Sequence, residues 1–446
     1  MSSRYVYLTV AVLPLFLVSC SNSDWHPEPV QNSKLAIKVY YSSVDSEQGY
    51  SGMQVGAFAA KETDDFKKAA NYIELQIEKD PDSPEEAARI ARRASLSPDV
   101  LAVIGHSRSG TTRAAMPFYA QAGIPVLMPT ATSPYVLYPF DERDGWPSVA
   151  HLKEDEKDYP RFTNAFRLRP SDVPDQVTAM KLTLNKLVDS AKPKIERKAK
   201  SELGPKIVLI CDTTSRNGSD VYTKPMCDDL RNDADISPKI ASYRPFSVDG
   251  DIYGLVTEIH AAKPDYIIIL GYPELARDVL EELTERMQKG QKALPYKFIL
   301  TDASLQNYLT KFSNDIYVTS SFNGGQAKRC EIPLAKSSHQ ELRAKKPDGA
   351  VLQDESYTFD AVLILAKAVN SCDAQVSRTC VMEYIEKHHA KLEGACETYF
   401  VENGERQNAA FNVSSVCGGA FKVRWLARVS GNDLEENPNW CKQGHR

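Results

Sequence analysis

The stretch that decides the fold is Leu101–Val136, LAVIGHSRSGTTRAAMPFYAQAGIPVLMPTATSPYV. An apolar strand ends at Ile104, and a polar turn over 105–112 leads into an expected helix over 109–121. A second apolar strand, 124–128, ends in another polar turn. A strand, a helix and a strand of these lengths predict a parallel βαβ unit with a crossover of the usual hand.

Hydroxyl side chains are concentrated in both polar turns. In a doubly wound sheet, ligands bind beyond the carboxyl ends of the strands, which is where both turns fall. Backbone N–H groups at the start of the expected helix, with the hydroxyls of Ser109 and Thr111 beside them, suit a carboxylate. The simpler role of such hydroxyls is N-capping by Ser107 or Ser109, which we also expect.

The alternation of strands and helices continues on both sides of this stretch. Upstream we expect strands and helices in the following order: strand 36–41, helix 51–61, strand 72–77, a helix opened by the capping box Ser83-Pro84-Glu85-Glu86, and strand 100–104. Downstream a second wound unit is expected to contain helices 174–189, 219–232, 251–262 and 273–288, and strands 207–211, 239–243, 266–270 and 297–300. An apolar helix over 356–370 and short strands after residue 400 follow. The predicted fold class is therefore α/β, with two doubly wound, Rossmann-like lobes.

Composition agrees with a globular chain of two or three domains. The chain has 446 residues, of which 42% are hydrophobic and 25% are charged. A net charge of −5 and the absence of a long basic run argue against a nucleic-acid partner. The charged segments 141–162 and 192–206 are expected to be exposed insertions on the surface.

The N-terminus carries an export signal. The apolar run 5–18 is too short for a membrane-spanning helix, which needs roughly 20 residues, and has the length of a signal-peptide core. It ends in Leu17-Val18-Ser19-Cys20, which resembles a bacterial lipobox and implies a signal peptide over 1–19 and lipidation of Cys20. Residues 20–33 then read as a tether in the cell envelope, and Ser21, by the enteric sorting pattern, favours the outer membrane over the inner one.

The remaining cysteines indicate disulfides. Removing Cys20 leaves an even number in an exported chain, which favours pairing in an oxidising compartment. The eight candidates are Cys211, Cys227, Cys330, Cys372, Cys380, Cys396, Cys417 and Cys441. The local pairings are 211 with 227, 372 with 380, and 396 with 417. No Cys or His cluster has zinc-ligand spacing, so no metal site is expected.

These motifs, in this order, resemble the type I periplasmic solute-binding proteins that bind branched-chain amino acids and amides. The match is most specific in 101–136, and weaker matches extend the resemblance over about 34–425: Tyr50-Ser51-Gly52, Asn164–Arg167, Asp265–Glu274, Leu300-Thr301-Asp302, Asp315–Thr319 and Ser356–Ala366. The resemblance implies two lobes joined by three crossovers, which close on a ligand as a hinged clamp without a cofactor. By position, lobe 1 is 34–166 plus 319–404, and lobe 2 is 167–318 plus 405–446.

The resemblance also implies ligand-binding residues. In amino-acid binders, hydroxyls and amides of lobe 1 hold the carboxylate, and the matching positions here are Ser109, Thr111, Thr130 and Thr132. Thr132 and an acid of lobe 2, here Asp302, hold the ammonium, and the aromatic Tyr272 packs on the ligand. The simpler roles are a helix N-cap for Asp302 and core packing for Tyr272. Tyr50 completes the implied set on the lobe-1 side.

One loop departs from the family pattern. An aromatic residue is expected after strand 207–211, but Arg216 or Asn217 stands there, which favours a ligand with an acid or amide group. Arg108 is a second cation that could serve an acidic ligand, although an arginine in a polar turn is usually solvated. The ligand's side chain therefore stays open.

Three functions are compatible with the sequence. The first is a non-enzymatic, lipid-anchored binding protein that delivers an amino-acid-like solute to an inner-membrane ABC permease. The second is an envelope sensor or interaction lipoprotein with the same fold, favoured by the outer-membrane signal. The third is a serine hydrolase, because Gly105-His106-Ser107-Arg108-Ser109 nearly matches the nucleophile elbow, although Ser109 replaces its second glycine and no downstream histidine has a catalytic setting.

Overall fold

The structure is a computed structural model, and the described part of the chain comprises residues 34–42, 51–81, 83–139, 147–149, 152, 160–195, 204–215, 218–286, 294–305, 307–312, 315–321, 353–372, 375–396, 398–407, 410–438 and 440–441. The predicted signal peptide, the tether with Cys20 and Ser21, and the residues Tyr50, Arg216, Asn217 and Cys330 lie outside it. Among the described helices, none has the length and apolar character required to cross a bilayer.

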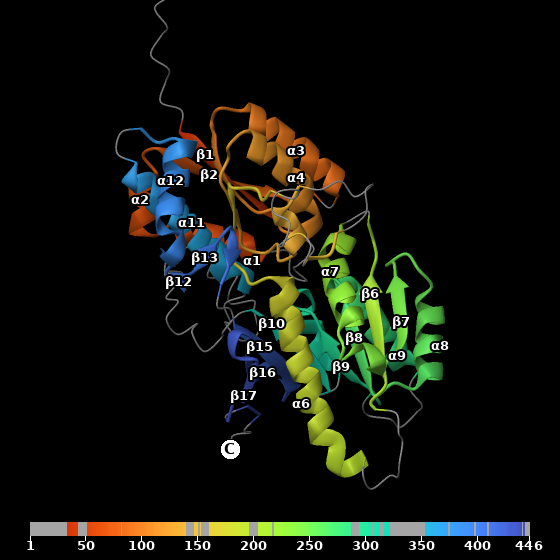
Figure 1. Ribbon diagram of the computed structural model, residues 1–446. Helices are drawn as coiled ribbons and strands as arrows, with labels where there is room; N and C mark the ends of the chain where they lie inside the picture. The colour runs from red at the N-terminus through yellow and green to blue at the C-terminus, as the bar shows by residue number, and fades with distance from the viewer. Residues whose placement is uncertain are drawn as a thin grey trace, which may run out of the picture. The chain divides into compact units, whose positions relative to one another are not determined.

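The first lobe is built on a parallel sheet of five strands in the order β2-β1-β3-β4-β5. The strands are β1 (Leu35–Tyr41), β2 (Ile73–Lys79), β3 (Val100–Ile104), β4 (Val126–Met128) and β5 (Ala165–Arg167). Helices α3 (Pro84–Leu96) and α4 (Ser109–Gln121) pack together on one face. Helices α1 (Gly52–Ala60), α2 (Asp64–Ala69), α11 (Gln353–Ser371) and α12 (Arg378–His388) form the other layer (Figure 1).

The second lobe is built on an eight-stranded sheet in the order β17-β16-β15-β10-β9-β8-β6-β7. Its parallel part contains β6 (Ile207–Asp212), β7 (Ile240–Phe246), β8 (Tyr266–Leu270), β9 (Lys297–Leu300) and β10 (Ile316–Ser320). The antiparallel strands β15 (Ala410–Cys417), β16 (Ala420–Arg428) and β17 (Asp433–Glu436) extend it at one edge. Helices α6 (Val177–Ile195) and α7 (Ser219–Asn232) cover one face, and α8 (Ile252–Ala262) and α9 (Pro273–Glu285) cover the other.

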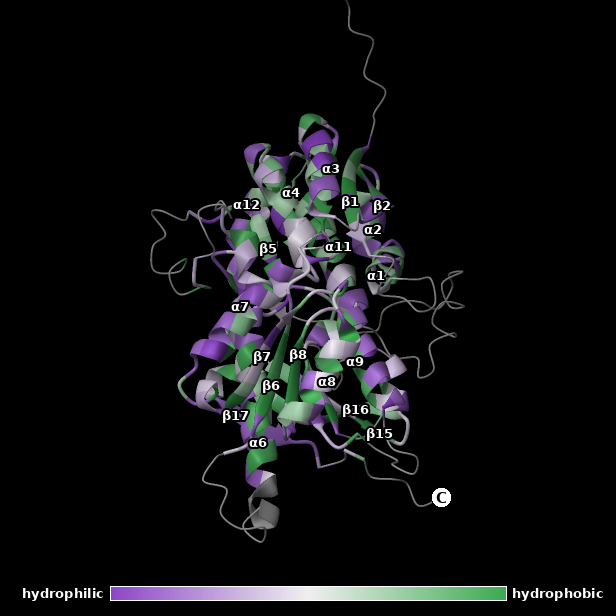
Figure 2. Cartoon of the chain, turned by 90° about the vertical axis from the view of Figure 1, so that its right-hand side faces the viewer, coloured by the Kyte–Doolittle hydropathy of each residue, from purple (hydrophilic) through white to green (hydrophobic). Residues whose placement is uncertain are grey.

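Alternating side chains place each strand between two helical layers. In β6, Leu209 packs in the core shared with α6 and α7, whereas Val208 and Ile210 pack in the core shared with α8 and α9. Both faces of the strand are thus buried, which is why its sequence is a continuous apolar run instead of an alternating one. Figure 2 shows β6 and β8 as hydrophobic strands among helices whose colours are mixed.

The predicted α/β class with two wound lobes is confirmed, and the predicted helix over 109–121 begins and ends at those residues. Ser83 caps α3 as expected, because its Oγ accepts a hydrogen bond from the Glu86 N–H at 3.2 Å. The short helix α2 was not predicted, since its six residues are too few to show a helical period. The residue boundaries assigned to the lobes stay a prediction.

Two of the three predicted local disulfides are confirmed, namely Cys211–Cys227 and Cys372–Cys380. The predicted pair of Cys396 with Cys417 is wrong, because Cys417 bonds to Cys441. Cys396 lies in the first lobe, where its N–H donates to Asp360 of α11, and it is disulfide-bonded to another partner. Cys417 ends β15 in the second lobe, so nearness in sequence does not bring these two cysteines together.

The chain passes between the lobes through segments that the buried Arg167 and the partly buried Arg406 connect. After β5 it enters the second lobe, and it returns to that lobe after the hairpin β13 (Val401–Glu402) and β14 (Glu405–Arg406). Arg167 of the first passage pairs with Glu405 of the last, with 3.3 Å between Nη2 and Oε1. Arg406 donates from Nη1 to the Leu168 carbonyl at 2.9 Å. These contacts fix the passages beside the carboxyl ends of both sheets.

Candidate functional site

Helix α4 begins at Ser109 without a side-chain cap. Its N-cap residue, Arg108, makes no capping hydrogen bond, and the first turn holds no acidic residue. The expected N-capping by Ser107 or Ser109 is therefore wrong. Ser107 instead donates from its Oγ and from its N–H to Asp80, and Ser109 accepts at its Oγ from the N–H of Ser133 at 3.2 Å. The positive end of the helix dipole is thus left without a charged group of its own first turn.

Asp80, just after β2, collects the donors of the first polar turn. Ser107 donates to Asp80 Oδ2 from N–H and from Oγ, both at 2.7 Å, and Thr111 Oγ1 donates to the same oxygen at 3.2 Å. His106 donates from Nδ1 to Oδ1 at 2.5 Å. Although burial raises the pKa of Asp80, the charge of His106 and these hydrogen bonds outweigh it and lower the pKa below its usual value.

His106 itself is enclosed by aromatic side chains. Its ring stacks on Tyr40 with 4.6 Å between centroids, and its Nε2 lies 2.9 Å from the Tyr119 hydroxyl. The hydroxyl of Ser107 therefore bonds to a carboxylate and not to an imidazole, so the near match to a nucleophile elbow does not produce a serine–histidine pair. Thr111, predicted to face a ligand, is completely buried and bonds within the first lobe.

The second polar turn, after β4, connects the first lobe to the rest of the chain. Thr130 Oγ1 donates to the His106 carbonyl at 3.3 Å. The Thr132 carbonyl accepts from Arg167 Nη1 at 2.6 Å and from the Asp172 N–H at 3.1 Å. Ser133 donates from Oγ to the Val221 carbonyl of α7 at 2.7 Å, which is a direct bond between the lobes.

Arg108 extends from the first lobe onto an aromatic ring of the second. Its guanidinium carbon lies 4.6 Å from the centroid of the Tyr272 ring, a cation–π arrangement, and its Nη2 lies 3.5 Å from Glu274 Oε1. Only 7% of Arg108 is exposed, so it is not the solvated turn residue that its sequence position suggests. Beside it the two backbones touch: a Cβ added to Gly110 would lie 2.4 Å from the Cα of Gly218. We call this region, from Arg108 to the crossover residues below, the lobe junction.

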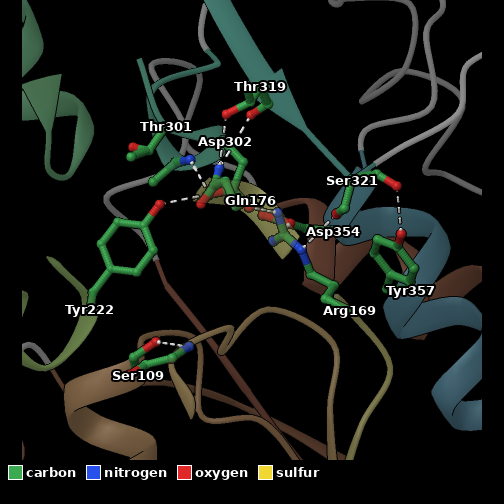
Figure 3. A network of polar contacts seen from close by, with 12 residues as sticks. Ser109, Arg169, Gln176, Tyr222, Thr301, Asp302, Thr319, Ser321, Asp354 and Tyr357 are labelled. Carbon is green, nitrogen blue, oxygen red and sulfur yellow. Dashed lines mark hydrogen bonds and ion pairs between the residues drawn. The ribbon is translucent and has the colours of Figure 1, made fainter. Parts of the chain in front are cut away.

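Asp302, the predicted ammonium acceptor, is already engaged by the chain (Figure 3). Its Oδ2 pairs with Arg169 Nη2, and its Oδ1 accepts from the Tyr222 hydroxyl at 2.6 Å and from the Ala303 N–H at 2.8 Å. The expectation that Asp302 is an N-cap is wrong, since Thr301 holds that position before the 302–304 turn. Tyr222 in turn stacks on Tyr272, with 5.1 Å between ring centroids.

Arg169 connects three parts of the chain at the junction. Besides Asp302, it bonds from Nη1 to Asp354 Oδ1 at 3.0 Å and from Nε to Ser321 Oγ at 3.3 Å (Figure 3). Burial alone lowers the pKa of Arg169, but the carboxylates of Asp302 and Asp354 raise it by more, so the guanidinium stays charged. A buried cation held by two carboxylates is a fixed part of the site.

Asp172, at the start of the π-turn Asp172–Gln176 that precedes α6, is the second buried acid of the junction. It is 1% exposed. Burial, and next the negative charge of Asp302, raise the pKa of Asp172 well above its usual value, although hydrogen bonding from Thr132 and the charges of Arg167 and Arg169 oppose them. This carboxyl therefore holds its proton to a higher pH than an ordinary aspartic acid does.

The structure brings some predicted site residues together and separates others. Ser109, Thr132, Tyr272 and Asp302 all lie at the lobe junction, whereas Thr111 and Thr130 bond inside the first lobe. Sequence reasoning missed Arg169, Asp172 and Tyr222. The run Arg167-Leu168-Arg169-Pro170-Ser171-Asp172, dense in charge directly after a buried strand, was the available signal.

A surface hollow of about 380 Å³ lies elsewhere, at the β13–β14 hairpin. Its lining shares no residue with the lobe junction and consists of His389, Ala390, Phe400, Val401, Glu402 and Gln407. It gathers no set of buried charged groups comparable to the junction.

No protein-family model matches the chain, and no curated protein is similar to it in sequence. Solved structures are similar in fold. A leucine-binding protein from Thermotoga maritima is 18% identical with a TM-score of 0.62, covering 88% of this chain and 98% of that one. A branched-chain amino-acid transporter substrate-binding protein from Streptococcus pneumoniae, in complex with isoleucine, is 17% identical with a TM-score of 0.60, covering 91% and 99%.

A third similar structure carries a different ligand. It is an ABC transporter solute-binding protein from R. palustris in complex with 4-hydroxybenzoate, 11% identical with a TM-score of 0.59, covering 92% of this chain and 99% of that one. These likenesses show that the chain has the two-lobed α/β fold of type I periplasmic binding proteins.

Proposed function

We propose that this chain, which has the fold of type I periplasmic binding proteins, is an extracytoplasmic solute-binding protein that captures a small, amino-acid-like carboxylate between its lobes. The observation that carries the proposal is the lobe junction itself. Polar and aromatic side chains of both lobes meet beyond the carboxyl ends of both parallel sheets, as Arg108 does over Tyr272 and Arg169 with Asp354. In wound sheets this is the place where ligands bind.

A carboxylate suits the Arg108 side of the junction. The uncapped start of α4 offers backbone N–H groups and the positive end of the helix dipole, and the Arg108 cation lies next to it. The similar structures from S. pneumoniae and R. palustris hold isoleucine and 4-hydroxybenzoate, and a carboxylate is the group that these two ligands share. The sequence also has Arg216 or Asn217 where the resemblance implies an aromatic residue, which favours a ligand with an acid or amide group.

The acidic side of the junction suits the other end of an amino acid. Asp172, Asp302 and Asp354 lie beside Arg169, which pairs with the last two, and the charge of Arg167 also acts on Asp172. A ligand with an ammonium at one end and a carboxylate at the other would complement both sides. Asp302 then acts by holding Arg169 and Tyr222 in place, since its oxygens already accept three hydrogen bonds or ion pairs.

The proposed setting is the bacterial envelope, with a lipid on Cys20 as anchor and an inner-membrane ABC permease as the recipient of the ligand. Ser21 supports the second candidate function, an outer-membrane sensor or interaction lipoprotein, because a carrier tethered there is remote from a permease. Membrane fractionation distinguishes the transport function from the sensing function, because it shows in which membrane the protein is found. Recovery with the inner membrane supports transport, and recovery with the outer membrane supports sensing.

Isothermal titration of the mature protein tests ligand capture. The panel contains the common L-amino acids, their side-chain amides and aromatic acids such as 4-hydroxybenzoate. We expect binding of at least one member, weakened by Arg108→Gln about tenfold or more through loss of a charge-assisted contact. Arg89→Gln, which removes an exposed arginine paired with Glu86 on α3, is the matched control and should not change the affinity. No heat from any member of the panel would contradict the proposal.

A further inference from the structure

Three buried side chains at the acidic side of the lobe junction carry oxygens that lack a hydrogen-bond partner within the described chain. They are Asp172 Oδ2, Gln176 Oε1 and Ser304 Oγ. The side chains are at most 1% exposed, and buried polar atoms nearly always find a partner. Each unpaired oxygen costs about 1–3 kcal/mol. All three can accept a hydrogen bond, and none of the described residues donates one to them.

The three residues lie on segments that meet at the lobe junction. The Asp172 N–H donates to the Thr132 carbonyl, which fixes the acid beside the second polar turn of the first lobe. Gln176 ends the same π-turn, and its Nε2 donates to Thr319 Oγ1 at 3.2 Å, at the end of β10. Ser304 closes the 302–304 turn that begins with Asp302. The region is therefore bounded by both lobes.

Asp302 and Asp172 differ in how many further hydrogen bonds or ion pairs their carboxyl oxygens can accept. Asp302 is paired on both oxygens by Arg169, Tyr222 and a backbone N–H, so an incoming cation would have to displace them. Asp172 has one oxygen without a partner among the described residues, and burial together with the charge of Asp302 favours its neutral form. The groups that face it are Asp302 from the 302–304 turn, Arg167 and Arg169 from the passage after β5, Thr132 from the turn after β4, and Tyr222 from α7.

We propose that Asp172 accepts the ammonium group of the ligand and gives up its own proton to solvent when the ligand binds. No covalent bond changes other than the O–H of this carboxyl, and the ligand keeps its ammonium protons. The exchange replaces a neutral, partly unpaired acid by a buried ion pair, which is the arrangement that a buried ammonium requires. The proposal rests on the proposed function and narrows it to ligands that carry a protonated amine.

A pH dependence follows from the exchange. Burial and the charge of Asp302 raise the pKa of the Asp172 carboxyl in the free protein. Below that pKa, ligand binding must expel one proton, so the affinity should rise by up to about tenfold per pH unit and level off above it.

Replacement of Asp172 by Asn tests the assignment. Asn has the same shape as the neutral acid, so Asp172→Asn should fold, whereas it cannot become a carboxylate. Asp175→Asn is the matched control, because Asp175 lies on the same π-turn but is only partly buried and accepts its hydrogen bond from the Ser171 N–H at 3.1 Å. The probes are the common L-amino acids and, for each, the same acid with hydrogen in place of the amino group, titrated into the mature protein and both variants.

We expect an amino acid to bind, Asp172→Asn to weaken it by about 30-fold or more, and Asp175→Asn to leave it within about twofold. The deaminated acid should bind weakly to all three proteins. Equal affinity of Asp172→Asn and the unaltered protein for the amino acid would overturn the assignment. Binding of deaminated acids with no binding of any amino acid would overturn it while leaving the proposed function intact, and no binding of either class would contradict both.

Discussion

Asp80 and Asp172 are equally buried, each 1% exposed, but their hydrogen bonding differs and their pKa values shift in opposite directions. Asp80 receives hydrogen bonds from Ser107, Thr111 and His106, and its pKa falls. Asp172 keeps an oxygen without a partner among the described residues, and its pKa rises. Burial therefore does not set the role of a carboxylate here. The hydrogen-bond donors and the neighbouring charges do, with His106 beside Asp80 and Asp302 beside Asp172.

This difference indicates that Asp80 belongs to the structural framework and Asp172 to the binding site. The Asp80 network is satisfied, so it fixes the polar turn before α4 and has no capacity for a ligand. The Asp172 region is incompletely satisfied, which costs stability and is worthwhile where a ligand completes it. The predictions below test this division, in order of the expected change in stability.

The largest effect is expected at Asp80. Asp80→Ala leaves His106 and the hydroxyls of Ser107 and Thr111 without their acceptor, so the free energy of unfolding should fall by about 3–5 kcal/mol. Urea denaturation measures it. Because the folded protein lowers the pKa of Asp80, its contribution is present above the unfolded value of 3.8 and is lost as the pH falls through the folded pKa. A loss of less than about 1 kcal/mol would contradict a structural role for Asp80.

A smaller loss is expected at Tyr222. Tyr222→Phe removes the 2.6 Å hydrogen bond to Asp302 but keeps the ring that stacks on Tyr272, and should cost about 1.5–3 kcal/mol. Tyr243→Phe, on the outer strand β7, serves as a matched loss of a hydroxyl. Equal denaturation midpoints for the two variants would show that the Asp302 network adds no stability.

At Asp172 the expected change in stability has the opposite sign, because the substitution should stabilise the protein. The folded protein raises the pKa of this acid, so its contribution is intact below the unfolded value of 3.8 and is lost as the pH rises toward the folded pKa. Asp172→Asn cannot ionise, so it should stabilise the free protein at neutral pH, by about 1 kcal/mol on the usual scale of a single substitution. The gain should vanish near pH 3 in thermal unfolding experiments. A destabilised variant at neutral pH would contradict a raised pKa of Asp172 in the folded protein.

The smallest change in stability is expected at Gly110. A Cβ there would meet the Gly218 backbone at 2.4 Å, so Gly110→Ala should hold the lobes apart without disturbing either core. We expect a free energy of unfolding within about 0.5 kcal/mol of the unaltered protein, together with ligand affinity reduced about tenfold or more. Gly123→Ala, where an added Cβ meets nothing within 4 Å, controls for the substitution, although its positive φ adds strain of its own. Unchanged affinity in Gly110→Ala would show that ligand binding does not depend on the contact of α4 with α7.

The sequence predicts the elements of this fold well because their signals are local. Apolar runs such as 207–211 and 266–270 mark strands buried on both faces, and the Ser83 capping box marks the start of α3. The site is only partly predictable for the same reason. Arg169 and Asp302 are 133 residues apart, and their pairing depends on passages that bring the ends of two sheets together. Ser107 likewise leaves its expected cap for Asp80, 27 residues upstream.

Titration calorimetry of the best-binding amino acid in two buffers of different ionisation enthalpy, such as phosphate and Tris, tests the central claim most directly. The difference in heat gives the number of protons that leave the protein on binding. We predict a release that approaches one proton per ligand below the pKa of Asp172 and that disappears in Asp172→Asn. Equal heats in both buffers across the pH range, with binding intact, would contradict the exchange of a proton for the ligand's ammonium at Asp172.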